Sequence, residues 1–398
     1  MTLAERESLD SVRELESLLL ERLRTPRPQE LEIDAAVALD LTDADGWTLR
    51  FRDGVISLSS GADPRADTTV ITDAATLVDV MTGARSGIEE FLEGRLHVRG
   101  NLALSLRLGD IFDVTVSDDR APRTSFAEVG KLRTFYLEAG AGTPVVLLHG
   151  LGATNVSLLP TLWDLATDHR VVAPDLPGFG ESSKPLRSYN SEFYAEWLKD
   201  LLDERGIERA HLVGNSMGGR VAIEAALRYP ERVDKLVLLA PSPAFIKRRE
   251  FVRLVGLLRP ELALLPLPVP RRQVMAGLKG MFSSPSRMEE GRLEAAADEF
   301  IRVFSTAKGR IAFFSAARQI YLEEPYGENG FWDRLPNLSR PALFVWGDRD
   351  RLVPAKFARH VQKALPRSES VVMEDCGHVP QFEHPERTNE LIRAFIDR

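Results

Sequence analysis

The sequence predicts an α/β protein: a small α+β domain, then a larger domain with a mostly parallel sheet and a helical cap. Alternating apolar and polar residues, typical of half-buried strands, occupy the first third of the chain. Continuous apolar runs that alternate with helical patterns occupy the rest, as in a parallel sheet. A chain of 398 residues, 44% of them hydrophobic, is long enough for two or three domains. We place the domains at residues 1–117 and 125–398, with 118–124 as a linker.

The first domain is expected to combine antiparallel strands with helices. Leucine and valine recur at three- and four-residue steps over residues 8–24, which predicts an amphipathic helix. The strand patterns at residues 39–42 and 47–51 are joined by Asp45-Gly46, a hairpin signal. The remaining expected elements are strands at 55–58, 69–72 and 96–98, and helices at 75–82, 87–92 and 101–112.

The second domain shows the apolar runs of buried parallel strands. The strand–helix alternation breaks off after Ala240 and resumes at Pro341. We therefore expect a helical cap at about residues 241–334, and its first part is strongly apolar. Prolines and charges interrupt that apolar part, so it does not predict a membrane span. The expected strands are residues 145–148, 210–213, 235–239, 342–346 and 371–373.

A candidate nucleophile lies between the second of these strands and the helix that follows it. Residues 214–218 read Gly-Asn-Ser-Met-Gly, which is the G-x-S-x-G pattern in its strand–turn–helix context. Such a turn is sharp and strained, and side chains at Gly214 and Gly218 would collide with the neighbouring strand and helix. The pattern points to the Oγ atom of Ser216 as the nucleophile. A helix-capping turn is the alternative interpretation.

Two later loops contain the groups that a serine nucleophile requires. A serine hydroxyl needs a base within hydrogen-bonding reach and a carboxylate that orients the base. His378 follows the last expected strand and is the candidate base. Asp348 and Asp350 both follow the strand before it, so either could orient the histidine. The order Ser, Asp, His along the chain is that of α/β-hydrolases.

Residues 125–398 resemble the α/β-hydrolase family on these motifs and on three more. The additional motifs are the strand ending in His149-Gly150, the loop at residues 175–182 and the helix start at 384–386. The resemblance implies a Ser216–His378–Asp350 triad, because the family pattern Gly-x-x-Asp before Val-Pro selects Asp350 over Asp348. It also implies an oxyanion hole from the backbone N–H groups of Leu151 and Met217, and a structural role for His149.

The first third resembles the sterol-carrier-protein lipid-transfer domain. The likeness rests on residues 47–54, 67–73, 92–101 and 104–108. Members of that family enclose an apolar tunnel for sterols, fatty acids or acyl-CoA. The alternative is that the corresponding residues fill an ordinary core. The tunnel wall implied by the resemblance would include Val80, Met81, Phe91, Leu102, Leu106 and Phe112.

Three functions follow, from different classes. The first is a serine hydrolase of lipophilic carboxylic esters that forms an acyl-enzyme, with an N-terminal domain that binds or delivers lipid. The second is a carbon–carbon bond hydrolase of the meta-cleavage type, which residues 214–219 and 229–232 resemble. The loop at 149–154 has fewer glycines than that subfamily, and Val379 replaces its common Trp. The third is a non-catalytic lipid-binding protein.

The composition limits partners and compartment. A net charge of −8 argues against non-specific nucleic-acid binding. Cys376 is the single cysteine, so no internal disulfide forms, and we expect neither a metal cluster nor a cofactor. The first residues are too charged for a signal peptide, and no apolar stretch predicts a transmembrane segment. The expected compartment is the cytoplasm, and the sequence does not predict the oligomeric state.

Overall fold

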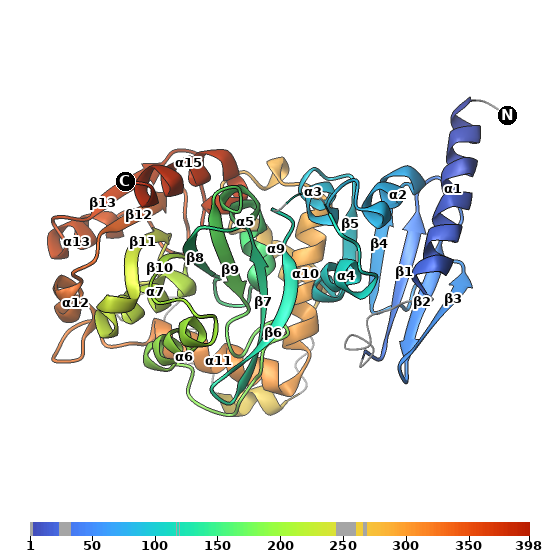
Figure 1. Cartoon of the computed structure of the whole chain (residues 1–398). Helices are drawn as coiled ribbons and strands as arrows, with labels where there is room; N and C mark the ends of the chain where they lie inside the picture. The colour runs from blue at the N-terminus through green and yellow to red at the C-terminus, as the bar shows by residue number, and fades with distance from the viewer. Residues whose placement is uncertain (1–2, 24–32, 117, 119, 244–259, 266–268) are drawn as a thin grey trace. The chain divides into compact units, whose positions relative to one another are not determined.

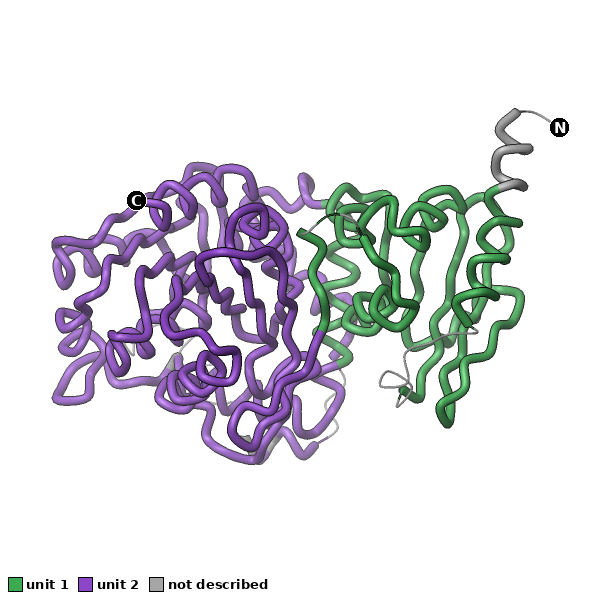
Figure 2. Tube along the Cα trace, viewed as in Figure 1, with its two compact units in different colours: residues 1–124, 289–302 green, residues 125–288, 303–398 purple. Residues whose placement is uncertain are grey.

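The computed structural model describes residues 3–23, 33–116, 118, 120–243, 260–265 and 269–398. The chain forms two compact units. Unit 1 comprises residues 1–124 and 289–302, and unit 2 comprises residues 125–288 and 303–398 (Figure 2). The domain limits expected from the sequence stay a prediction.

Unit 1 contains a five-stranded sheet in the order β3-β2-β1-β4-β5 and four helices from the N-terminal part of the chain (Figure 1). The expected hairpin is confirmed, because β1 and β2 pair antiparallel on either side of Asp45-Gly46. Asp73, Ser86 and Asn101 cap the three short helices with their side chains. The elements are α1 (Leu3–Arg22), β1 (Ala35–Leu41), β2 (Trp47–Arg52), β3 (Val55–Ser60), β4 (Thr68–Thr72), α2 (Ala74–Thr82), α3 (Gly87–Leu92), β5 (His97–Gly100) and α4 (Leu102–Ile111).

One pairing in this sheet differs from the antiparallel layout expected. Strand β4 runs parallel to β1, with Val37 opposite Thr68. After β3 the chain returns to the other side of β1, where the Ala36 N–H donates to Asp67 Oδ2 at 2.7 Å. The Asp67 N–H in turn donates to the Ala36 carbonyl at 2.9 Å. Apolar–polar alternation shows which face of a strand is buried, but it does not show the direction of the neighbouring strand.

Helix α10 (Glu290–Phe304) lies in the middle of the expected cap, yet residues 289–302 belong to unit 1. The Arg99 guanidinium joins β5 to this helix, with its Nε 2.7 Å from Asp298 Oδ2 and its Nη1 3.0 Å from Glu294 Oε2. The Gly100 N–H also donates to Asp298 Oδ2, at 3.2 Å. Unit 1 therefore includes a helix encoded about 190 residues after its last strand, and deleting residues 1–117 would remove the partners of that helix.

Unit 2 is organised around an eight-stranded sheet in the order β13-β12-β11-β10-β8-β9-β7-β6. Pairing is parallel from β9 through β8 to β13, and β7 is antiparallel to β9. This confirms the mostly parallel sheet predicted from the apolar runs. The strands are β6 (Arg123–Val129), β7 (Leu132–Ala139), β8 (Thr143–Leu148), β9 (His169–Pro174), β10 (Ala210–Asn215), β11 (Val233–Leu239), β12 (Ala342–Gly347) and β13 (Glu369–Met373).

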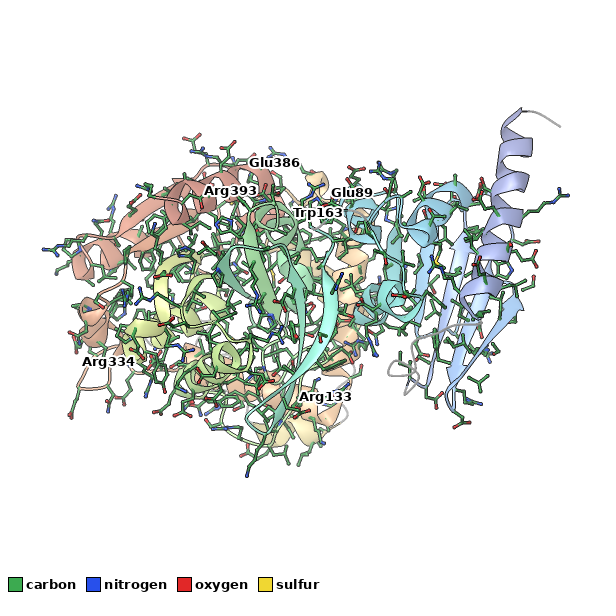
Figure 3. The ribbon with its side chains drawn as sticks, viewed as in Figure 1. Glu89, Arg133, Trp163, Arg334, Glu386 and Arg393 are labelled. Carbon is green, nitrogen blue, oxygen red and sulfur yellow. The ribbon has the colours of Figure 1, made fainter. Side chains whose placement is uncertain are left out.

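Helices cover both faces of this sheet (Figure 1). Helices α6 and α7 pack on one face, and α5 and α15 pack on the other. Arg393, labelled in Figure 3, joins α15 to α5 through a 2.6 Å contact between its Nε and Asp164 Oδ2. The covering helices are α5 (Leu159–Leu165), α6 (Ser191–Glu204), α7 (Met217–Arg228), α13 (Phe357–Ala364) and α15 (Pro385–Ile396).

Between β11 and β12 the described residues are helical, with no strand among them. The apolar opening of the cap at residues 244–259, and Leu267, lie outside the described residues. Within the described residues, no helix has both the length and the apolar character needed to cross a membrane. The elements are η4 (Pro260–Leu264), α9 (Arg271–Lys279), η5 (Pro285–Arg287), α10, α11 (Ala307–Tyr321), α12 (Phe331–Arg334) and η6 (Leu335–Asn337).

A buried ion-pair network joins α7 to the end of the cap. Glu224 is 1% exposed and accepts hydrogen bonds from Arg228 at 2.7 Å and from Arg334, labelled in Figure 3, at 2.8 and 2.9 Å. Arg220 pairs with both Glu224 and Glu323. Burial alone raises the pKa of the Glu224 carboxyl. The hydrogen bond from Arg334 and the charge of Arg220 outweigh burial, and the pKa falls to about 2.

Replacing Glu224 with glutamine is expected to lower the free energy of unfolding by about 3 kcal/mol at neutral pH, because it weakens the pairing of the buried Arg220 and of the partly exposed Arg228 and Arg334. The depressed pKa means that the stability due to Glu224 is present above about pH 4.5 and is lost as the pH falls towards 2. Urea unfolding of both proteins from pH 7 to pH 3 should show the gap narrowing below pH 4.5. A gap that stays constant with pH would contradict this origin.

Candidate active site

The candidate nucleophile occupies a strained turn between β10 and α7. Ser216 has φ 54° and ψ −113°, a conformation that side-chain-bearing residues rarely adopt. A Cβ on Gly214 would lie 2.5 Å from the Gly218 backbone, and one on Gly218 would lie 2.1 Å from the Leu148 carbonyl oxygen. The two glycines therefore allow the turn to pass close to its own helix and to β8. Ser216 is buried at the end of β10.

His378 and Asp350 meet at the carboxyl ends of β12 and β13. The Nδ1 atom of His378 lies 2.7 Å from Asp350 Oδ2, and both side chains are buried. The other oxygen of Asp350 accepts the N–H groups of Leu352 and Val353, each at 2.8 Å. A carboxylate only accepts hydrogen bonds, so a hydrogen bond to it requires the histidine tautomer with the proton on Nδ1.

Asp348, the rival acid, has a different environment. Its Oδ1 accepts the Cys376 N–H at 3.1 Å, and its own N–H donates to the Met373 carbonyl at 3.0 Å. Its side chain is exposed. Asp348 thus ties two loops together, whereas Asp350 contacts the histidine ring.

The cap and Glu383 hold the histidine loop in place. The His378 N–H donates to the Met281 carbonyl at 2.7 Å, and the Asn215 side chain donates to the His378 carbonyl at 3.1 Å. Glu383 accepts the Gly377 N–H at 2.6 Å through one oxygen and the Ser283 N–H at 2.7 Å through the other. Sequence reasoning did not find Glu383, and its place five residues after His378 is the only signal that the sequence offers.

The loop after β8 lies beside the nucleophile. A Cβ on Gly150 would lie 3.5 Å from the Ser216 Cβ. His149 fixes this loop, since its Nδ1 contacts the Gly150 carbonyl at 2.8 Å and its Nε2 accepts the Leu176 N–H at 2.9 Å. Burial lowers the pKa of His149 to about 4, so the ring is neutral at ordinary pH.

The two expected oxyanion-hole donors are the residues that follow Gly150 and Ser216 in the chain. Leu151 directly follows Gly150 and packs against the core. Met217 is the first residue of α7, and the first N–H groups of a helix have no partner within the helix. Ser216 directly precedes α7, at the positive end of the helix dipole. Both expected donors are therefore close in sequence to residues that lie near Ser216.

Two other kinds of group could in principle carry chemistry, a cysteine thiol and a metal-binding cluster. Cys376 is buried, and burial raises the pKa of its thiol to about 12, so the thiolate needed for reaction is disfavoured. Among the described residues, no group of three or more His, Cys, Asp and Glu side chains is placed to hold a metal ion.

Both the N-terminal part and the C-terminal part of the chain are similar to known protein families. The model of the SCP-2 sterol transfer family matches residues 19–113, so the first third is a domain of that family. A 2-hydroxy-6-oxononadienedioate/2-hydroxy-6-oxononatrienedioate hydrolase from Paraburkholderia phymatum is 32% identical over 304 residues, covering 71% of this chain and 98% of the relative.

Two solved structures extend the comparison. One is described as a membrane phospholipase A and bacterial virulence factor. It has a TM-score of 0.60 and 28% sequence identity, and the match covers 81% of this chain and 94% of the phospholipase chain. The other is a meta-cleavage product hydrolase from Pseudomonas fluorescens, with a TM-score of 0.58 and 25% sequence identity. The match covers 69% of this chain and 97% of the hydrolase chain. The model of the alpha/beta hydrolase fold matches residues 143–385. On this match, and on the sheet and the elbow that carry it, the chain belongs to the α/β-hydrolase family.

Proposed function

We propose that the protein is a serine hydrolase of lipophilic carboxylic esters. The observation that carries this proposal is the 2.7 Å contact between His378 Nδ1 and Asp350 Oδ2. Asn215, which precedes Ser216 in the elbow, donates to the His378 carbonyl at 3.1 Å and so joins the histidine to the elbow. The contact leaves His378 Nε2 as the base. Ser216 is then the nucleophile, and Asp350 holds the ring in the tautomer that catalysis needs.

The reaction would proceed in two halves. Ser216 Oγ attacks the ester carbonyl while its proton passes to His378 Nε2, and the N–H groups of Leu151 and Met217 stabilise the oxyanion. His378 then gives the proton to the departing alcohol, leaving an acyl group on Ser216. Water, deprotonated by His378, releases the acid in the second half. Each oxyanion donor typically contributes about 3 kcal/mol to stabilising the transition state.

Two observations favour a lipophilic substrate. The SCP-2 domain belongs to a sterol transfer family, so the same chain pairs a hydrolase with a lipid-transfer fold. In that domain Met81, Phe91, Leu102 and Phe112 are buried, and Val80 and Leu106 are half-buried. The second observation is the 28% identity to a solved structure that is described as a phospholipase. We propose that the N-terminal domain binds lipid for the hydrolase.

Carbon–carbon bond hydrolysis is the second candidate, favoured by the 32% identical relative that is named for a dienedioate substrate. Such a substrate has two carboxylates, which a buried site must neutralise. Two buried arginines of unit 2 already have partners: Arg220 pairs with Glu224 and Glu323, and Arg310 donates to the carbonyls of Ala263, Phe304 and Ser305. Lys247, Arg248 and Arg249 lie outside the described residues.

Hydrolysis of p-nitrophenyl esters from acetate to palmitate tests the proposal on the full-length chain. We expect turnover whose kcat/KM rises with acyl length, because longer chains bury more apolar surface at roughly 25 cal/mol per Å². The same protein is then mixed with a 2-hydroxy-6-oxo-dienoate, whose visible absorbance is lost on cleavage. Bleaching of the dienoate without ester turnover would replace the first proposal with the second.

A further inference from the structure

A second buried hydroxyl lies beside the candidate nucleophile. The Oγ atom of Ser242 is 3.3 Å from the Oγ of Ser216, and either hydroxyl could donate. Ser242 is fully buried, and its backbone N–H donates to the Ser216 carbonyl at 3.0 Å. The two serines come from different strands of the sheet, one after β10 and the other after β11.

The turn that positions Ser242 is itself strained. Ala240 follows β11 with φ 44°, in the left-handed region that residues other than glycine seldom adopt. Its N–H still donates to the Val345 carbonyl at 2.8 Å, so the chain leaves the sheet abruptly after this residue. Pro241 then packs against the elbow, where a Cβ on Gly219 would lie 2.8 Å from the Pro241 Cβ. Strain of this kind concentrates at functional sites.

The backbone of Ser242 and the ring of Pro241 hold this turn against the elbow. The backbone N–H makes the bond to the Ser216 carbonyl, and an alanine would make the same bond. Pro241 supplies the packing against Gly219. What the hydroxyl adds is a polar hydrogen within reach of the Ser216 Oγ, in a buried position where electrostatic interactions are strong.

We propose that Ser242 is a further catalytic residue, whose hydroxyl donates a hydrogen bond to the Ser216 Oγ during nucleophilic attack. The inference rests on the proposed serine hydrolase function. As the Ser216 proton passes to His378 Nε2, partial negative charge develops on the Ser216 Oγ, before the new C–O bond carries that charge to the carbonyl oxygen. Ser242 keeps its own proton, and its hydrogen bond to the Ser216 Oγ is strongest while the partial charge is present. The same bond assists when Ser216 leaves the acyl group in the second half of the reaction.

A fluorophosphonate probe measures this effect without knowledge of the natural substrate. Ser216 Oγ forms a bond to phosphorus, fluoride departs, and the serine proton passes to His378. We expect Ser242→Ala to label about five- to tenfold more slowly than the wild type, which is the value of one hydrogen bond in the transition state. The fall should appear in the maximal labelling rate at saturating probe, and the shape of the pH profile should be retained because His378 remains the base.

A matched pair of variants separates the hydroxyl from the shape of the side chain. Threonine and valine have nearly the same volume, and only threonine has a hydroxyl. Ser242→Thr should label faster than Ser242→Val by a similar factor, whatever strain the extra methyl group introduces into both. Thermal unfolding verifies that each variant is folded before its labelling rate is compared. Equal rates for threonine and valine, or an alanine variant that labels at or above the wild-type rate, would overturn the proposal.

Two controls distinguish failure of this inference from failure of the proposed function. Wild type must become labelled and Ser216→Ala must not. If the wild type is inert to the probe, the proposed function itself is refuted and the role of Ser242 falls with it. If the wild type reacts at Ser216 and the Ser242 variants react equally fast, only the role of Ser242 is lost.

Discussion

Ser216→Ala is expected to abolish ester turnover, with kcat falling by about 10⁶-fold. The substitution removes the oxygen proposed to form the acyl-enzyme and leaves the remaining groups of the site in place. Residual hydrolysis would come from the oxyanion donors acting on water, which typically retain a factor of about 10³–10⁴ over the uncatalysed reaction. Active-site titration and steady-state kinetics on the best p-nitrophenyl ester measure the loss.

The fold of the Ser216→Ala variant should be unchanged. Alanine keeps the Cβ, so the cost of the positive φ is the same as for serine. The contacts that Gly214 and Gly218 permit are also retained. Calorimetry should therefore give the wild-type Tm. Substantial turnover in a correctly folded variant would mean that another residue is the nucleophile.

The larger features of the fold follow from local sequence patterns. Buried strands such as β8 and β12 are continuous apolar runs, and the hairpin of β1 and β2 has the Asp45-Gly46 turn. The parallel pairing of β1 with β4 was not predicted, because it depends on a crossing connection and on the contact between Asp67 and Ala36. The grouping of α10 with unit 1 was not predicted either, because it depends on a contact between Arg99 and Asp298, which are 199 residues apart in the sequence.

The sequence also predicted some residues of the candidate site and not others. Ser216, His378 and Asp350 could be selected because each follows a strand and carries a recognisable local pattern. Ser242 and Glu383 could not. Ser242 stands in a Pro-Ser-Pro sequence that predicts only a turn, and Glu383 is one acidic residue in a charged C-terminal region. Their contacts with Ser216 and with Gly377 exist only once separate strands and loops are assembled.

Asp350→Asn is expected to lower kcat by about 10⁴-fold with little loss of stability. The N–H groups of Leu352 and Val353 donate to one carboxylate oxygen, and in the variant they hold the amide oxygen at that position. The amide NH₂ then faces His378 Nδ1, which must accept a hydrogen bond and lose its proton to Nε2. A protonated Nε2 cannot take the proton of Ser216, so the nucleophile is no longer activated.

Asp348→Asn is the matched control, because it makes the same change two residues away. The side-chain amide oxygen of this variant can still accept the Cys376 N–H, so the loop should keep its structure and kcat should change little. Steady-state kinetics at saturating ester, with circular dichroism to verify folding, compare the two variants. A large loss in the Asp348 variant with a small one in the Asp350 variant would transfer the orienting role to Asp348. Such a result would contradict the 2.7 Å contact on which the proposed mechanism depends.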